Sequence, residues 1–157
     1  MIENKEITVR RLVGSDLPLI LELEKEAENY ANDPSVSFFV EDMDPDQESM
    51  AYGIFEKDNL IGFCSLGYSD IDRQMNRAKG YVEGYLLSDL YIKKEMQRKG
   101  YGSLLIQEIL RRETEPIYLT PIGMIEDGYS GPTERYFARF GFRPFFKEYM
   151  RYEGEKL

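Results

Sequence analysis

Apolar and polar residues alternate in several stretches of this chain, and each stretch predicts a strand with one buried face. The expected strands cover residues 7–12, 50–56, 60–68, 81–92, 117–121 and 145–152. Lys57-Asp58-Asn59 joins the second of these strands to the third and is typical of a hairpin turn. The pattern therefore predicts a sheet whose longest strand runs over residues 81–92.

Apolar residues at helical spacing predict helices in several segments between these strands. One apolar stripe over residues 17–23 predicts a helix directly after the first strand, and another predicts a helix over 101–112. A short helix is expected over 132–140, and a further short one fits within 32–48. Because strands and helices interleave, the sequence predicts an α/β fold, and its length favours a single domain over 1–157.

The run Gln97-Arg98-Lys99-Gly100-Tyr101-Gly102 lies between the longest strand and the helix at 101–112. Two glycines at a helix entry let bare backbone N–H groups converge on a ligand, and the helix dipole adds partial positive charge there. Lys93 and Lys94 add full charges nearby. This arrangement predicts a phosphate-binding loop. The usual P-loop and dinucleotide motifs do not occur, which disfavours an unrelated nucleotide-binding domain.

Composition narrows the chemistry further. The formal charge of −9 argues against nucleic acid as a partner, and the absence of histidine excludes histidine-based triads and bases. No apolar run reaches the ~18 residues of a membrane span, and the start of the chain does not resemble a signal peptide. Cys64, the single cysteine, is expected in the core. We therefore expect a soluble, cytoplasmic protein.

An acidic segment raises the question of a metal site. Asp42, Asp44 and Asp46 are spaced as in a calcium loop, but the sixth position from Asp42 is Gln47 rather than Gly, and the twelfth is Gly53 rather than Glu. The segment is therefore interpreted as a solvated acidic loop, and no metal is expected.

Two short motifs carry a resemblance to a known family. Leu90-Tyr91-Ile92-Lys93-Lys94-Glu95-Met96-Gln97-Arg98-Lys99-Gly100-Tyr101-Gly102 resembles the acetyl-CoA-binding signature of the GNAT N-acetyltransferases, which ends in Gln/Arg-x-x-Gly-x-Gly/Ala. Tyr136-Phe137-Ala138-Arg139-Phe140-Gly141-Phe142 resembles their second signature. The resemblance covers nearly the whole chain and implies a mixed central sheet of about six to seven strands flanked by about four helices.

The resemblance also implies a binding site for acetyl-CoA as cosubstrate. In this family, backbone groups of the fourth strand bind the pantetheine arm, and the loop and helix start after it bind the pyrophosphate. One further position, Ser130, stands where many members have an asparagine that touches the cofactor. The implied cofactor-binding residues are Leu90, Tyr91, Ile92, Gln97, Arg98, Lys99, Gly100, Tyr101, Gly102, Ser103 and Ser130.

The catalytic groups are less directly implied. Family members often carry a tyrosine acid where this chain has Phe137, and Tyr136 would point about 100° away around a helix. Tyr129 is therefore the candidate acid. Glu83 and Asp89 on the longest strand are candidate bases, with Glu83 preferred. Strict alternation puts both on the face of Leu87 and Tyr91, but this strand often has a bulge in the family, so the face stays open.

The expected function is that of a GNAT-type acyltransferase, which moves the acetyl group of acetyl-CoA to a primary amine by direct attack. The amine is a small molecule or an exposed amino group. The alternative is an acyl-CoA-binding module with weak or no catalysis, because the usual tyrosine position holds Phe137. The acceptor loops carry no readable motif. Because family members often dimerise, a homodimer is also among the expectations.

Overall fold

The structure is a computed structural model that describes residues 6–27, 35–68, 84–120, 133–146 and 149–154. The described strands are β1 (Ile7–Val13), β2 (Glu48–Glu56), β3 (Asn59–Tyr68), β4 (Tyr85–Ile92), β5 (Ile117–Leu119), β6 (Phe142–Phe146) and β7 (Tyr149–Tyr152). The described α-helices are α1 (Leu17–Ala27), α3 (Tyr101–Arg112) and α5 (Thr133–Ala138). Short 3₁₀ turns are η1 (Gly14–Asp16), η2 (Val36–Phe39) and η3 (Lys94–Met96).

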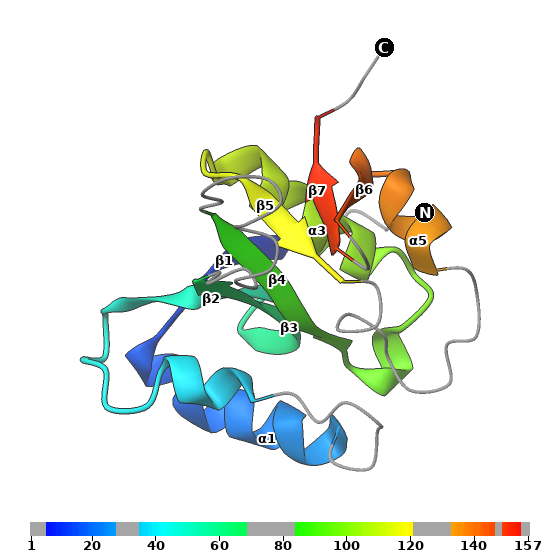
Figure 1. Ribbon diagram of the computed structural model, residues 1–157. Helices are drawn as coiled ribbons and strands as arrows, with labels where there is room; N and C mark the ends of the chain where they lie inside the picture. The colour runs from blue at the N-terminus through cyan, green and yellow to red at the C-terminus, as the bar shows by residue number, and fades with distance from the viewer. Residues whose placement is uncertain (1–5, 28–34, 69–83, 121–132, 147–148, 155–157) are drawn as a thin grey trace.

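The described strands form one mixed sheet in the order β1-β2-β3-β4-β5-β7-β6 (Figure 1). Neighbouring strands are antiparallel except β4 and β5, which are parallel. A parallel pair needs a crossover between its strands, and α3 lies in that crossover. The turn of the β2–β3 hairpin lies where the sequence predicts it. Glu56 pairs with Asn59 across the turn, and Lys57 within it adopts a φ of 55°.

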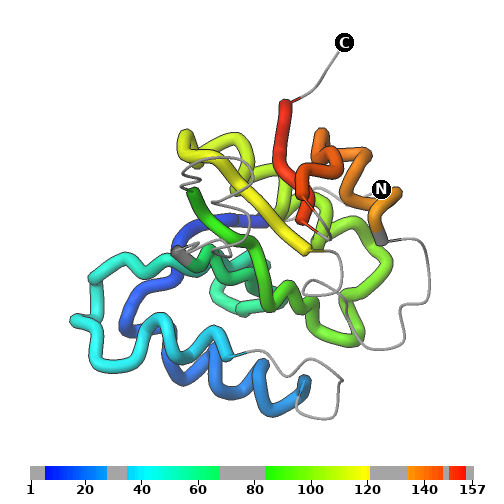
Figure 2. The backbone as a smooth tube through the Cα atoms, in the orientation of Figure 1, coloured from blue at the N-terminus to red at the C-terminus, as the bar shows by residue number. Residues whose placement is uncertain are grey.

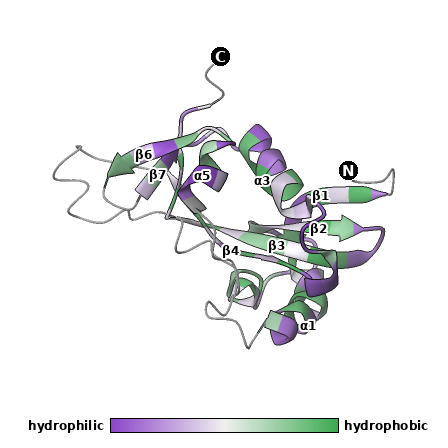
Figure 3. Ribbon diagram, turned by 90° about the vertical axis from the view of Figure 1, so that its right-hand side faces the viewer, coloured by the Kyte–Doolittle hydropathy of each residue, from purple (hydrophilic) through white to green (hydrophobic). Residues whose placement is uncertain are grey.

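Helices cover both faces of the sheet (Figure 3). On one face α1 and η2 bury Ile20, Leu23 and Val36 against a cluster that includes Phe63 and Tyr91. On the other face α3 and α5 contribute to the larger cluster, and their members there are Tyr101, Leu105, Ile106, Ile109 and Phe137. Because both faces are covered, β2 reads as a nearly continuous buried run rather than a clean alternation.

The expected elements agree with the structure in most places and differ in three. The strand expected over 145–152 is two strands, β6 and β7, which pair antiparallel with Phe146 opposite Tyr149. No Gly or Asn marks the chain reversal between them, so the aromatic run reads as one strand. The described residues contain three α-helices rather than about four. Leu21, one of the apolar residues of α1, is 49% exposed, because the buried stripe of α1 is Ile20, Leu23 and Ala27.

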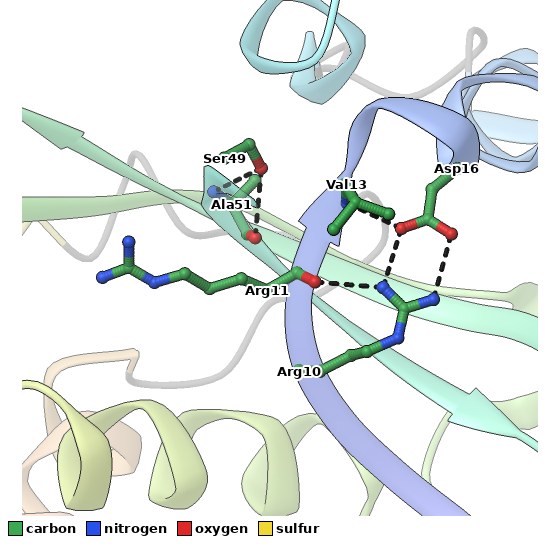
Figure 4. A network of polar contacts seen from close by, with 6 residues as sticks. All are labelled: Arg10, Arg11, Val13, Asp16, Ser49 and Ala51. Carbon is green, nitrogen blue, oxygen red and sulfur yellow. Dashed lines mark hydrogen bonds and ion pairs between the residues drawn. The ribbon is translucent and has the colours of Figure 1, made fainter. Parts of the chain in front are cut away.

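A buried carboxylate fixes the entry to α1 (Figure 4). Asp16 is 5% exposed and accepts hydrogen bonds from both terminal nitrogens of Arg10, at 2.8 and 3.0 Å. It also accepts one from the backbone N–H of Val13 at 2.7 Å. Burial raises the pKa of Asp16, but the hydrogen bonds from Arg10 and Val13 outweigh that effect and hold the pKa below its ordinary value.

We expect Asp16→Asn to lower the free energy of unfolding at pH 7 by about 1.5–3 kcal/mol, the range for hydrogen bonds to charged groups. A carboxyl whose pKa is lower in the folded state stabilises the protein above its unfolded pKa, and that contribution is lost as pH falls through the folded pKa. The difference between wild type and variant should therefore shrink below about pH 4. Urea unfolding at pH 7 and pH 3 measures it.

The control is Asp58→Asn in the exposed β2–β3 turn, which should change stability by less than about 0.5 kcal/mol. An Asp16→Asn loss of equal size at both pH values would show that the charge of Asp16 contributes nothing.

Candidate functional site

The expected phosphate-binding loop lies where β4 passes into α3 (Figure 2). After β4 the chain makes the turn η3 and then enters α3, which begins at Tyr101 with Gly100 as its N-cap. Gly100 has a φ of 93°, a left-handed conformation that a glycine adopts at no steric cost. Arg98 also has a positive φ, of 62°. The first N–H groups of a helix have no partner within it, so those at the start of α3 are available to an anion.

Gln97 anchors this loop to the strand before it. Its side-chain amide donates to the carbonyl of Ile92 at 2.7 Å, and its backbone N–H donates to Lys94 at 3.3 Å. The N–H of Lys93 donates to Ile61 on β3 at 2.8 Å. These bonds hold the loop in place without a ligand. Contact between Gln97 and a ligand stays a prediction.

Gly102 leaves space at the start of α3. A Cβ built there would lie 3.6 Å from Cγ1 of Ile92 and 3.9 Å from the hydroxyl of Tyr136, which are ordinary contacts. Packing therefore does not require glycine at this position, although a glycine within a helix costs about 1 kcal/mol relative to alanine. Arg98 and Lys99 are exposed beside it. The site suits close approach of an anionic ligand to the backbone.

Tyr136 lies beside the candidate site, although the sequence did not place it among the cofactor-binding residues. Its hydroxyl lies 3.1 Å from Oγ of Ser103, so α5 delivers a phenol to the first turn of α3. Helical spacing predicts only that Tyr136 points about 100° away from Phe137, and it does not say which of the two side chains meets α3. Phe137 is 3% exposed and belongs to the core. The packing of α5 against α3 decides which of the two reaches the site, and no local pattern reports it.

Near this loop, β4 and β5 are no longer paired with each other. Strand β5 pairs with β4 only at Tyr85 and Leu86, and within the described residues no strand pairs with the rest of that edge of β4. Among the described strands, the carboxyl end of β4 therefore pairs with β3 alone. Ligands of open α/β sheets bind at such strand ends, and an extended ligand can pair with a free edge.

A β-bulge interrupts β4 near its middle. Between the pairs Ser65–Ser88 and Phe63–Tyr91, β3 contributes one residue and β4 contributes two, Asp89 and Leu90. Asp89 has a φ of 55°, a conformation that aspartate tolerates better than most residues. Strict alternation along β4 is therefore broken here.

The bulge changes which side chains share a face. Leu87 lies in the same core cluster as Leu90 and Ile92, on the α3 face, whereas Tyr91 belongs to the α1 face. The strict pattern, which grouped Leu87 with Tyr91, is wrong, because the extra residue of the bulge shifts the side-chain period by one.

The carboxylate of Asp89 is half-buried against β3. The hydroxyl of Ser65, which is fully buried, lies 3.1 Å from Oδ2 of Asp89. Burial raises the pKa of Asp89, and the hydrogen bond from Ser65 offsets only part of that rise. A half-buried carboxylate with a raised pKa in a polar cluster is a candidate proton acceptor.

The acidic residue Glu26 links α1 to the other side of the loop. Its carboxylate accepts a 2.6 Å hydrogen bond from the hydroxyl of Tyr91 and a 3.0 Å bond from the N–H of Lys94. The end of α1 is thereby tied to β4 and to η3. The sequence offered no signal for this contact, because Glu26 is one of three glutamates on α1.

The single cysteine lies in the core. Cys64 is fully buried, and its thiol contacts the carbonyl of Ser88 at 3.4 Å. Burial raises the pKa of this thiol, and the nearby charge of Asp89 adds to the rise. The expectation that Cys64 is a core residue is confirmed.

Three predicted site residues, Glu83, Tyr129 and Ser130, lie outside the described residues. In the part of the chain that the structure describes, no three Cys, Asp or Glu residues gather as a metal site. No helix among those segments is both long and apolar enough to cross a membrane.

Comparison with known proteins identifies the family. The sequence model described as the acetyltransferase (GNAT) domain matches residues 47–144. That segment runs from the start of β2 through β4, the glycine loop and α3 to the start of β6, and so contains every described element of the site except Glu26. No curated protein matches the chain.

Solved structures with this fold include several acetyltransferases. A GNAT family acetyltransferase from Brucella melitensis, solved with acetyl-CoA, is 16% identical, with 98% of this chain and 92% of that chain covered and a TM-score of 0.57. Diaminobutyrate acetyltransferase from Paenibacillus lautus, solved with L-2,4-diaminobutyric acid and coenzyme A, is 13% identical, with coverage of 74% and 66% and a TM-score of 0.52.

The loading GNATL domain of CurA from Lyngbya majuscula is 16% identical, with coverage of 73% of this chain and 64% of that chain and a TM-score of 0.52. This chain therefore spans less than two thirds of the length of two of these three proteins. At such identities the likeness establishes the fold.

Proposed function

The chain belongs to the GNAT acetyltransferase domain family, and from this premise we propose that it transfers the acetyl group of acetyl-CoA to a primary amine. The observation that carries the proposal is the junction of β4 and α3. There Gly100 turns the chain with a positive φ, Gly102 leaves space beside Ile92 at the end of β4, and among the described strands β5 pairs with β4 only at its start. This junction suits a ligand with both a diphosphate and an extended arm.

The donor fits this junction in two parts. The diphosphate of acetyl-CoA accepts hydrogen bonds from backbone N–H groups over residues 98–103, and Arg98 and Lys99 add positive charge. The pantetheine arm lies along the edge of β4 near residues 90–92, where an extended ligand can add to the sheet. A backbone N–H near Ile92 polarises the thioester carbonyl and stabilises the oxyanion that forms during attack.

The reaction needs a base, because an amine is largely protonated at neutral pH. The ammonium loses one proton to a carboxylate, directly or through water, and the free nitrogen attacks the thioester carbonyl. A C–N bond forms, the C–S bond breaks with the thiolate of CoA as the leaving group, and the nitrogen releases its second proton to water. Asp89 and Glu83 are the candidate bases. Asp89 has the stronger support, because it lies half-buried at the bulge of β4 and its pKa is raised.

The departing thiolate takes its proton from an acid or from water. Tyr129 is the acid we propose from the sequence, and Tyr136 is the phenol that lies at the start of α3.

We expect Tyr129→Phe to lower kcat about tenfold or more and to remove the alkaline limb of its pH profile. We expect Tyr136→Phe to raise the KM for acetyl-CoA instead. Steady-state kinetics between pH 6 and 10 distinguish the two roles. If Tyr136→Phe lowers kcat and removes the alkaline limb, while Tyr129→Phe only raises the KM, the acid is Tyr136.

Two measurements test the function as a whole. Acetyl-CoA at 100 times its Kd should stabilise the fold by about 2.7 kcal/mol and raise Tm accordingly. A panel of amines should then release CoA thiol, detected with a thiol reagent, above the rate of hydrolysis without amine. Failure of acetyl-CoA to shift Tm would overturn donor binding. If acetyl-CoA raises Tm but no amine releases thiol, the alternative of an acyl-CoA-binding module is favoured. The sequence supports that alternative through Phe137, which stands where family members often carry a tyrosine acid.

The acceptor is proposed only as a class. Diaminobutyrate acetyltransferase acts on a small diamine acid, and a small amine or an exposed amino group is the corresponding class here. The carboxylate of Asp89 meets Ser65, which alternation along β3 places on the α1 face with Phe63. An acceptor that uses Asp89 therefore approaches from that face.

A cytoplasmic location and a homodimer stay predictions. Sedimentation of the purified protein tests whether it is a homodimer.

A further inference from the structure

We propose that Ser65 is a positioning residue, whose hydroxyl holds the carboxyl group of Asp89 both before and after that group takes a proton. The inference rests on the proposed function, with Asp89 as the base. It goes further by assigning a role to a side chain on a different strand that carries no part of either sequence motif.

Ser65 has three oxygen atoms within hydrogen-bonding distance of its hydroxyl. Oγ of Ser65 lies 3.1 Å from Oδ2 of Asp89, 3.0 Å from the carbonyl oxygen of Ser88 and 2.8 Å from Oγ of Ser88. A hydroxyl has one proton to donate and two lone pairs to accept with. It can therefore donate to one of these atoms at a time and accept from another.

This arrangement satisfies Asp89 in both protonation states. While Asp89 is a carboxylate, the hydroxyl of Ser65 donates to Oδ2. Once Asp89 has taken a proton from the acceptor ammonium, its O–H donates to Oγ of Ser65, and the hydroxyl of Ser65 rotates to the carbonyl of Ser88. Asp89 keeps a hydrogen bond to Ser65 in both states, and the carbonyl of Ser88 keeps the thiol of Cys64 when the hydroxyl turns to Asp89, so the proton transfer avoids the cost of an unsatisfied carboxyl group.

The surroundings favour this role over simple packing. Ser65 is fully buried between Cys64 and Leu66, both of which lie in the apolar core. A hydroxyl at such a depth is costly unless it is hydrogen-bonded. Its partners exist because the bulge of β4 turns the backbone of Asp89 into the left-handed region and brings the carboxylate to β3. The bulge therefore supplies the hydrogen-bond partner that the buried hydroxyl of Ser65 needs.

Few charged or titratable groups compete for Asp89. On β3 the facing titratable group is the thiol of Cys64, which stays neutral because burial raises its pKa. Within the described residues, no lysine or arginine of α1, α3 or β4 pairs with Asp89. Ser65 is thus the described neighbour whose removal should change the titration of Asp89 most.

The test is the pH profile of Ser65→Ala. A hydrogen bond to the carboxylate lowers the pKa of Asp89, so its loss should move the acidic limb of kcat/KM upward by about one pH unit. We expect kcat to fall at neutral pH while the Kd for acetyl-CoA is unchanged. Ser65→Thr keeps the hydroxyl and should return the limb toward its wild-type position.

Ser49→Ala is the matched control. Ser49 is also buried in the sheet, and its hydroxyl bonds to the backbone of Ala51, the β2 partner of Ser65, rather than to a carboxylate (Figure 4). It should change Tm as much as Ser65→Ala does and leave the pH profile in place. If both variants leave the acidic limb unmoved, Ser65 has no positioning role.

Asp89→Asn separates failure of this inference from failure of the proposed base. If Asp89→Asn removes the acidic limb and Ser65→Ala does not move it, Asp89 is the base and the inference about Ser65 is wrong. If Asp89→Asn keeps the wild-type rate and limb, the base itself is wrong, and the inference falls with it.

Discussion

Acetyl-CoA should lose roughly 100-fold or more in affinity, about 2.7 kcal/mol, when Gly102 is replaced by glutamate. The side chain would occupy the space that the diphosphate needs, and its negative charge would repel the phosphates at close range. The protein itself should tolerate the change. A Cβ at this position meets only ordinary contacts, at 3.6 and 3.9 Å.

The unliganded variant should even be slightly more stable. Replacing a helical glycine removes a penalty of about 1 kcal/mol, and an acidic side chain in the first turn interacts favourably with the helix dipole. Gly102→Glu should therefore have an equal or higher Tm than wild type without ligand, and little or no shift with acetyl-CoA. Thermal shift and equilibrium binding measure the two effects separately.

A charge-matched control lies on the same helix. Gln107→Glu adds the same charge at an exposed position further along α3, and it should leave acetyl-CoA affinity within about twofold of wild type. Undiminished affinity in Gly102→Glu would mean that the diphosphate does not bind at this helix start.

Replacing Asp89 with asparagine should lower kcat by about 10²–10⁴-fold, the usual contribution of a general base. The amide cannot take a proton from the acceptor. It keeps the shape of the carboxyl group and can still accept from Ser65. Asparagine also tolerates the positive φ that the bulge imposes, so the backbone should not relax. The Kd for acetyl-CoA should stay unchanged.

The pH dependence follows from the direction of the shift. Because burial raises the pKa of Asp89, the acidic limb of wild-type kcat/KM should lie above the ordinary value of 3.8 for an aspartate. A carboxyl whose pKa is raised by folding destabilises the fold once it is charged, so its contribution to stability is lost as pH rises. Asp89→Asn should therefore keep or increase stability at pH 7 while it loses activity.

Glu83→Gln is the variant to compare with it. If Glu83→Gln loses the acidic limb and Asp89→Asn keeps it, Glu83 is the base, which is the choice we preferred from the sequence. If both keep it, a different group or water accepts the proton. Rates should be measured at saturating acetyl-CoA, so that donor binding does not contribute.

The geometry of the proposed donor loop was largely predictable, because its determinants are local. An apolar strand, a run with two glycines and an amphipathic helix follow one another within residues 85–112, and α3 covers the residues that helical spacing predicts. Backbone N–H groups and a helix dipole need no distant partner to form. Gly100 takes the left-handed conformation that such a turn requires.

The contacts of the proposed proton-transfer groups were not predictable in the same way. Ser65 and Asp89 are separated by 24 positions and meet only because the bulge of β4 lies opposite Cys64. A bulge shifts the face of every later side chain by one, and no residue type in β4 marks it unambiguously. Tyr136 likewise meets Ser103 across 33 positions, through the packing of α5 against α3.

The sequence by itself thus determined the family, the order of the elements and the loop that we propose holds the donor, because each depends on residues close together along the chain. Only the tertiary structure decided that β5 leaves β4 after Leu86, that Asp89 is half-buried against Ser65, and that Tyr136 rather than Phe137 reaches the helix start. These are matters of register and packing between distant segments. Alternation and spacing along one chain do not encode them.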